Sequence, residues 1–135
     1  MKESLLDKIQ TAVYSVVNPR IGLVTSSVNS AYVFMVNYSA GFDQAIQAAS
    51  RNLVYNLLMS SAISKLTQNL SKIKNPVLAW TLATAVPWAV ANTILYSVHK
   101  FGGTPKPLES LIFANLIGLV VGPTVIYGTR KGYMK

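Results

Sequence analysis

Residues 108–128, LESLIFANLIGLVVGPTVIYG, and residues 77–98, VLAWTLATAVPWAVANTILYSV, decide the fold of this chain. The second stretch holds no charged residue, and the first holds only Glu109 near its start. A helix needs about 20 consecutive apolar residues to cross the hydrocarbon core of a bilayer. Both stretches reach that length, and Trp80 and Tyr96 lie near the ends of one of them, where aromatic rings favour the membrane interface. We therefore expect two transmembrane helices, Val77–Val98 and Leu108–Gly128.

Two weaker segments precede this pair. Ile21–Tyr38 is an apolar run thinned by Ser and Asn, and Asp43–Leu66 has helical spacing with an apolar second half. A turn at Ala40-Gly41 separates them, and the polar connector Leu66–Asn75 follows. We expect both segments to span as well, which gives four transmembrane helices. In the alternative, residues 21–38 and 45–63 do not cross, and they form a helical lobe beside two spans.

The N-terminal segment has a different pattern. From Ser4 to Val17, apolar residues recur at helical spacing among charged ones, and Asn18-Pro19 ends the pattern. We predict an amphipathic helix on the membrane surface over residues 1–20, a first hairpin over 21–74 and a second over 75–135. The chain is thus expected to be one all-α membrane domain, a helical bundle of four transmembrane helices.

Short matches between the two hairpins raise the hypothesis of a duplication. If it holds, the fold is a repeated helical hairpin with both copies in one orientation, as in some transporters. The matched pairs are Asn18-Pro19 with Asn75-Pro76, Tyr38-Ser39 with Tyr96-Ser97, and Asn56-Leu57 with Asn115-Leu116.

The basic residues predict the orientation. The chain has 12 Lys and Arg against 4 Asp and Glu, and basic residues concentrate on the cytoplasmic side of membrane proteins. One predicted side holds Lys2, Lys8, Arg20, Lys65, Lys72, Lys74, Arg130, Lys131 and Lys135, and the other holds Arg51, Lys100 and Lys106. Both termini are therefore expected on the cytoplasmic or an equivalent matrix side, and the charge requires no nucleic-acid partner.

Small residues four positions apart predict close helix contacts in lipid. The clearest pair is Gly118 and Gly122, followed by Pro123, and its partner is either another helix of this chain, which we favour, or a second copy. Pro87 and Pro123 are expected to kink their helices. Two further pairs have the same spacing, Ser60 with Ser64 and Thr81 with Ala85.

The polar residues within the predicted spans are mainly amides, and Asn29, Asn56, Asn92 and Asn115 are the principal candidates. Amides can bridge helices or contact a substrate, and we favour bridging, because hydrogen bonds between helices are common in membrane bundles. Asp43, Gln47 and Arg51 form a polar stripe at four-residue spacing. The stripe is interpreted as an exposed helix entry, or as a polar funnel into a site.

Chemical motifs are sparse. The chain has no Cys and a single histidine, His99, so we expect no metal site and no cofactor. The four carboxylates are scattered and no nucleophile pattern is present, so no catalytic residue is assigned and we do not expect an enzyme.

These features favour a non-enzymatic structural or accessory subunit of a membrane complex, or a self-assembling oligomer. Its expected partners are the lipid bilayer and other membrane subunits or its own copies. The alternative is a small oligomeric transporter or channel built from duplicated hairpins.

Overall fold

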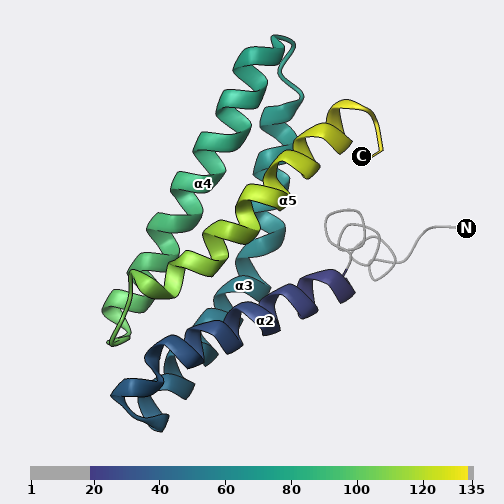
Figure 1. Cartoon of the computed structure of the whole chain (residues 1–135). Coiled ribbons are helices and arrows are strands. Elements are labelled where there is room, and N and C mark those ends of the chain that lie inside the picture. Colours follow the sequence, from purple (N-terminus) through teal and green to yellow (C-terminus); the bar gives the residue numbers. More distant parts are fainter. Residues whose placement is uncertain (1–18, 134–135) are drawn as a thin grey trace, which may run out of the picture.

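The computed structural model describes residues 19–133, and Figure 1 shows their arrangement. In this range all regular secondary structure is helical, as predicted, and the amphipathic helix expected over Ser4–Val17 lies outside the described residues. The elements are α2 (Pro19–Asn37), the 3₁₀ helix η1 (Tyr38–Ala40), α3 (Phe42–Ser71), α4 (Pro76–Phe101), the 3₁₀ helix η2 (Glu109–Leu111) and α5 (Ile112–Arg130).

The helix boundaries follow local chemistry. Helix α4 begins at Pro76, and the side-chain oxygen of Asn75 accepts a hydrogen bond from the backbone N–H of Leu78 at 3.1 Å, the usual N-cap arrangement. Helix α3 continues to Ser71, through half of the connector predicted over Leu66–Asn75, because residues 66–71 contain neither Pro nor Gly.

The predicted loop after α4 is also shorter than expected. Helix α4 continues past Val98 to Phe101, so His99 lies on the helix instead of in the loop. Gly102 and Gly103 then end the helix, and Gly103 has a φ of 70°, a conformation that glycine adopts readily.

Helices α2 and α3 pack through small residues. Asn52 of α3 donates a hydrogen bond to the Ser30 hydroxyl of α2 at 3.2 Å, which places these two faces in contact. The buried residues around this contact are Ser26, Ser30, Ala45, Ala48 and Ala49. Small side chains let two helix backbones approach closely, which is the packing typical of helices in lipid.

Helix α4 packs mainly against α3, through a second line of small residues, Ala79, Ala83 and Pro87, all of them buried. The Tyr55 hydroxyl of α3 donates to the Ala91 carbonyl of α4 at 2.9 Å. Helix α5 joins this pair less closely, and Figure 1 shows α4 and α5 near one another at one end and separated toward the other.

The helices meet most closely at the end formed by η1, Gly41 and the loop between α4 and α5, which we term the loop end. Asn37 is fully buried there. Its amide nitrogen donates to the Ser110 hydroxyl at 2.9 Å, and its oxygen accepts from the Lys106 backbone N–H at 2.9 Å. One side chain thus ties the end of α2 to the loop before α5.

The residue pairs matched in the hypothesis of a duplication compare differently in the structure. Pro19 and Pro76 are the first residues of α2 and α4. Tyr38-Ser39 forms the start of η1, after the end of α2, whereas Tyr96-Ser97 lies inside α4. In addition, α2 and α3 pack along a long interface, whereas α4 and α5 diverge. One matched pair thus holds equivalent positions and another does not, so the duplication stays a hypothesis.

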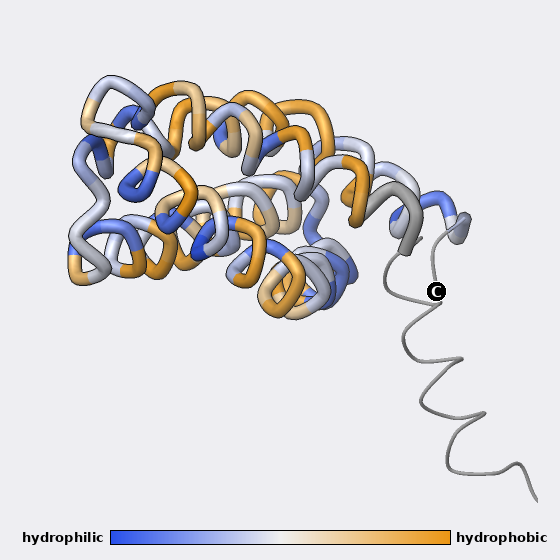
Figure 2. The backbone as a smooth tube through the Cα atoms, turned by 90° about the horizontal axis from the view of Figure 1, so that it is seen from below, coloured by the Kyte–Doolittle hydropathy of each residue, from blue (hydrophilic) through white to orange (hydrophobic). Residues whose placement is uncertain are grey.

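Large apolar side chains point outward on all four described helices, whereas most buried side chains are small or polar. The backbone coloured by hydropathy in Figure 2 shows hydrophobic stretches recurring along the helices. Among the described helices, Pro76–Phe101 and Glu109–Arg130 are long and apolar enough to cross a membrane, and only 17% of the most apolar part of each is buried. A water-soluble bundle has the opposite pattern, with its large apolar residues inside.

Candidate functional site

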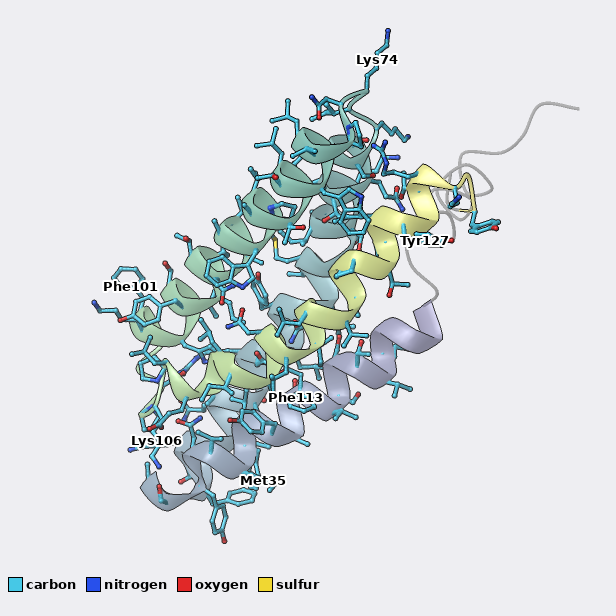
Figure 3. All side chains as sticks on the ribbon, turned by 45° about the horizontal axis from the view of Figure 1, so that its top comes forward. Met35, Lys74, Phe101, Lys106, Phe113 and Tyr127 are labelled. Atoms are coloured by element: carbon cyan, nitrogen blue, oxygen red, sulfur yellow. The ribbon has the colours of Figure 1, made fainter. Side chains whose placement is uncertain are left out.

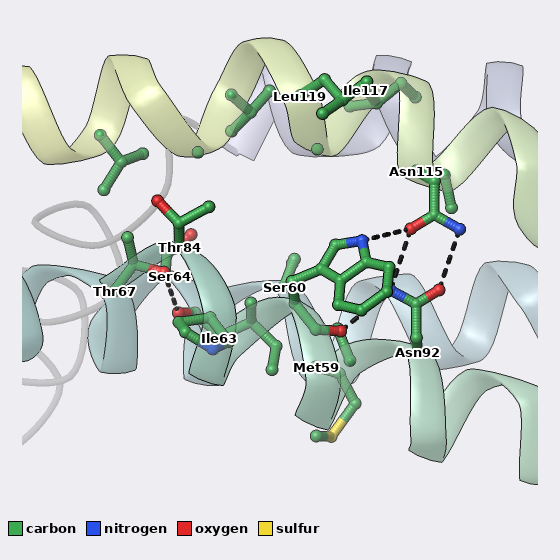
Figure 4. A pocket seen from close by; sticks show the side chains of 18 of the residues that line it. Met59, Ser60, Ile63, Ser64, Thr67, Thr84, Asn92, Asn115, Ile117 and Leu119 are labelled. Atoms are coloured by element: carbon green, nitrogen blue, oxygen red, sulfur yellow. Dashed lines mark hydrogen bonds between the residues drawn. The ribbon is translucent and has the colours of Figure 1, made fainter. Parts of the chain in front are cut away.

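A groove of about 290 Å³ lies between α3, α4 and α5. Figure 4 shows it from close by, with α5 on one side and α3 and α4 on the other. Its surface is mostly apolar, and residues that the sequence singled out line it from all three helices. They are Asn56, Ser60 and Ser64 of α3, Pro87 and Asn92 of α4, and Asn115, Gly118, Gly122 and Pro123 of α5.

Asn92 and Asn115 close one end of the groove as a pair. Each amide nitrogen donates to the other's oxygen at 2.9 Å, and the Trp88 indole N–H also donates to the Asn115 oxygen at 2.9 Å. Figure 4 shows this cluster linking α4 to α5. The sequence pointed to both amides but not to their pairing or to the part played by Trp88.

The pair uses all of its donors. The second N–H of Asn92 reaches the Trp88 carbonyl at 2.9 Å, and that of Asn115 reaches the Leu111 carbonyl at 3.0 Å. An amide has two N–H donors and one oxygen with two lone pairs. Only one lone pair of the Asn92 oxygen remains available. This geometry therefore suits a hydrogen-bonded link between α4 and α5, which we term a staple, better than a substrate contact.

Gly118 and Gly122 border the groove instead of an interhelical contact. A Cβ atom added to either glycine would meet nothing within 4 Å. The close packing against another helix of this chain, which we favoured from the sequence, is therefore not found among the described residues. Ser60 and Ser64 likewise line the groove and are half-buried.

Thr81 and Ala85 are both exposed, so this predicted packing pair does not lie on the buried face of α4. The buried line of small residues on α4 is Ala79 and Ala83, two positions earlier. A shift of two residues turns a helix by more than half a circle. Spacing alone identified a small-residue pattern on α4 but not which of its two faces packs against α3.

Pro87 and Pro123 both line the groove within continuous helices. A proline has no backbone N–H, so the carbonyls of Ala83 and Leu119 lose their usual helical partners. Ala83 and Leu119 line the groove too. The polar groups of an otherwise apolar groove are thus these regions of backbone, the amide cluster, the Asn56 side chain, and the hydroxyls of Tyr55, Ser60, Ser64, Thr67 and Thr84.

The other candidate amides lie in different surroundings. Asn56 lines the groove and donates to the Asn52 carbonyl of its own helix at 2.9 Å. Asn29 is buried on α2, and its side-chain oxygen has no partner among the described residues. Asn52, which the sequence analysis did not select, is fully buried at the contact with α2.

The predicted polar stripe lies at the loop end, outside the groove. Arg51 donates to the Gln47 side-chain oxygen at 3.1 Å, whereas no ion pair between Asp43 and Arg51 is found. The Arg51 side chain lies against Gly102, where an added Cβ would come within 2.7 Å of it. Of the stripe, Arg51 therefore packs α3 against the end of α4, whereas Asp43 and Gln47 are exposed.

His99 is fully buried near this stripe, and its Nδ1 shares a hydrogen bond of 3.0 Å with the Thr104 hydroxyl. Within residues 19–133 no group of three or more His, Cys, Asp or Glu side chains could hold a metal ion.

Positive charge gathers at the opposite end, which we term the basic end and define by Lys72, Lys74, Arg130 and Lys131. Arg130 donates to the carbonyls of Ser71 and Ile73 at 3.1 and 3.2 Å, so α5 ends beside the end of α3. Figure 3 shows Lys74 and Lys106 at opposite ends of the molecule. The acidic residues of the described range, Asp43 and Glu109, both lie at the loop end.

No protein-family model, curated protein or solved structure matches this chain. The groove, the amide pair and the two contrasting ends are therefore interpreted from their own geometry.

Proposed function

We propose that this chain is a four-span integral membrane protein without enzymatic activity. It acts as a structural or accessory subunit, through lateral contacts with other membrane helices or with its own copies. The observation that carries the proposal is the outward display of large apolar side chains on α2, α3, α4 and α5 around a core of small and polar residues. Lipid and apolar helices are the surroundings in which this distribution is stable.

The length of α3 and the alternation of the helix connections between the two ends of the molecule support four spans. Helix α3 has 30 residues, about 45 Å at 1.5 Å per residue, which equals the thickness of a bilayer with its headgroups. The contacts of Asn37 with Lys106 and of Arg130 with Ser71 place successive connections at opposite ends. The basic end then corresponds to the cytoplasmic side.

An exposed line of small residues on α4 supports lateral association. Thr81, Ala85 and Ala89 are exposed at four-residue spacing, and no helix of the described chain covers them. Small residues in such a line let a second helix approach closely in lipid. The transporter alternative draws less support, because the Asn92–Asn115 pair has no free donor for a passing substrate.

Photo-crosslinking tests this proposal. The chain has no cysteine, so an Ala85→Cys variant carries one photo-reactive maleimide in this exposed line of α4. Irradiation in the native membrane should give one defined adduct, with a second copy or with one foreign subunit. A Val120→Cys variant is the control, because Val120 is 69% exposed among large neighbours on α5. Adducts with lipid alone at Ala85→Cys, and a monomeric native mass, would contradict the proposal.

A further inference from the structure

We propose that the groove binds one acyl chain of an anionic phospholipid, with the phosphate of that lipid at the basic end. The inference rests on the membrane embedding proposed above and identifies a ligand for the groove. Four observations support it: the volume of the groove, its length, the Asn92–Asn115 pair that closes one end, and the positive charge near the other end.

The volume selects a slender apolar ligand. The groove offers about 290 Å³, and an engineered apolar cavity of about 150 Å³ holds a benzene molecule. The groove is therefore wide enough for a hydrocarbon chain without any change in the helices.

The length corresponds to one leaflet. On α5 the lining runs from Ala114 to Val125, which is about 16 Å at 1.5 Å per residue. Half of the hydrocarbon core of a bilayer is about 15 Å. A chain that enters from the basic end can therefore lie along α5 to the depth of the amide pair.

The polar groups permit an alkyl occupant. The donors of Asn92, Asn115 and Trp88 already have acceptors inside the chain, so this closed end needs nothing from the ligand. The Ser60, Ser64 and Thr84 hydroxyls lie on helices, where such a group can turn to the carbonyl four residues back. The other lining donors also bond inside the chain: the Tyr55 and Thr67 hydroxyls donate to the Ala91 and Ile63 carbonyls, and one N–H of Asn56 donates to the Asn52 carbonyl. An acyl chain in the groove breaks none of these hydrogen bonds.

The charge selects an anionic headgroup. The lining ends at Thr67 on α3 and Val125 on α5, about one turn before the basic end. Lys72, Lys74 and Lys131 are exposed there, and within the described residues no carboxylate lies at this end. A lysine close to an anionic lipid surface contributes about 1 kcal/mol, roughly a fivefold preference. Anionic lipid is enriched in the cytoplasmic leaflet, the side assigned to this end.

Fluorescence quenching by brominated acyl chains tests the proposal, because Trp88 lines the groove and Trp80 does not. The full chain is reconstituted in equal mixtures of phosphatidylglycerol and phosphatidylcholine, with bromine on the chains of one lipid at a time. In a Trp80→Phe variant, we expect stronger quenching of Trp88 when phosphatidylglycerol carries the bromine. A Trp88→Phe variant reports Trp80 outside the groove and should show no such preference.

Two pairs of variants probe the two parts of the site. Gly118→Leu fills the groove where a Cβ meets nothing within 4 Å, so quenching of Trp88 and its lipid preference should fall. Ala62→Leu, at an exposed position outside the lining, should change neither. Lys72→Gln with Lys74→Gln should reduce the preference roughly fivefold per lysine, whereas Lys100→Gln with Lys106→Gln at the loop end should keep it.

The outcomes separate the lipid site from the membrane proposal. Equal quenching by the two lipids, or a preference that survives Gly118→Leu, would overturn the lipid site while the protein still floats with the vesicles. Weak quenching by both lipids, together with crosslinking between copies in a Gly122→Cys variant, would assign the groove to a second helix instead. A chain that does not float with the vesicles would refute the embedding itself.

Discussion

Asn92 and Asn115 bind each other twice, each amide nitrogen donating to the other's oxygen at 2.9 Å, at the level where α4 and α5 meet. Toward the basic end the two helices diverge, and the groove occupies the space between them. The pair therefore fixes the contact between α4 and α5, and the groove depends on it for its closed end.

Replacing either amide by leucine should destabilise the fold, because the remaining amide loses a partner in a partly buried site. We expect the Asn92→Leu and Asn115→Leu double variant to cost less than the sum of the single variants. The coupling should be about 0.6 kcal/mol and at most about 1.7 kcal/mol, the mean and the maximum found for hydrogen bonds between membrane helices. Reversible unfolding of the four proteins in mixed micelles measures it, and strictly additive costs would show that the pair does not act as a staple.

Asn37 should be the most sensitive amide in the chain. It is fully buried and bonds to Val33, Lys106 and Ser110, so Asn37→Ala leaves several groups at the loop end without partners. We expect a loss of about 2–3 kcal/mol in the free energy of unfolding. Asn29→Ala is the matched control, because Asn29 is also buried but its oxygen has no partner within residues 19–133. An equal loss in both variants would mean that burial, and not the Asn37 network, sets the cost.

Arg130 should hold the end of α3 in place. Its guanidinium donates to the carbonyls of Ser71, the last residue of α3, and of Ile73, two residues after it. Arg130→Gln should cost about 1 kcal/mol and speed amide hydrogen exchange in residues 68–73. Lys131→Gln, which removes an equal charge beside it, should leave exchange there unchanged. Similar exchange in the two variants would assign the effect to net charge.

Gly102 and Gly103 should respond to alanine for different reasons. At Gly102 an added Cβ would come within 2.7 Å of both Arg51 and the Val98 carbonyl, so Gly102→Ala forces the Arg51 side chain to move. At Gly103 nothing lies within 4 Å, but φ is 70°, which costs a non-glycine residue about 1–2 kcal/mol. Arg51→Ala should therefore relieve part of the cost of Gly102→Ala and none of the cost of Gly103→Ala. Thermal unfolding of the single and double variants decides between these outcomes.

The sequence predicted much of the secondary structure, for local reasons. The Asn75-Pro76 pair marks the start of α4, and the apolar runs give the approximate course of α4 and α5. The prediction was wrong where it treated polar residues as a connector, because Thr67–Ser71 continue α3 and bury three of their side chains. Polarity alone did not end that helix.

The candidate site was harder to predict, because it depends on which face of each helix meets which neighbour. Thr81–Ala85 and Ala79–Ala83 have the same spacing, yet only the second pair is buried. Gly118 and Gly122 have the pattern of a tight contact, but the divergence of α5 from α4 leaves them beside the groove. Trp88 carried no sequence signal as a partner of Asn115, since the two residues lie 27 positions apart.

The four-span topology predicts opposite accessibility for the two ends of α3. Phe42 is exposed at the loop end and Lys74 is exposed at the basic end, so single cysteines at these positions should react with an impermeant maleimide from opposite sides of sealed vesicles. The variant Lys74→Cys should react from the cytoplasmic side, where the basic end is expected. If α2 and α3 instead form a lobe beside two spans, Phe42→Cys and Lys74→Cys will label from the same side.

Lys106→Cys provides the internal reference, because Lys106 lies in the loop between the two most apolar helices and contacts Asn37. If Phe42→Cys labels from the same side as Lys106→Cys, the result supports four spans. If Phe42→Cys labels from the same side as Lys74→Cys and not from that of Lys106→Cys, the result refutes them.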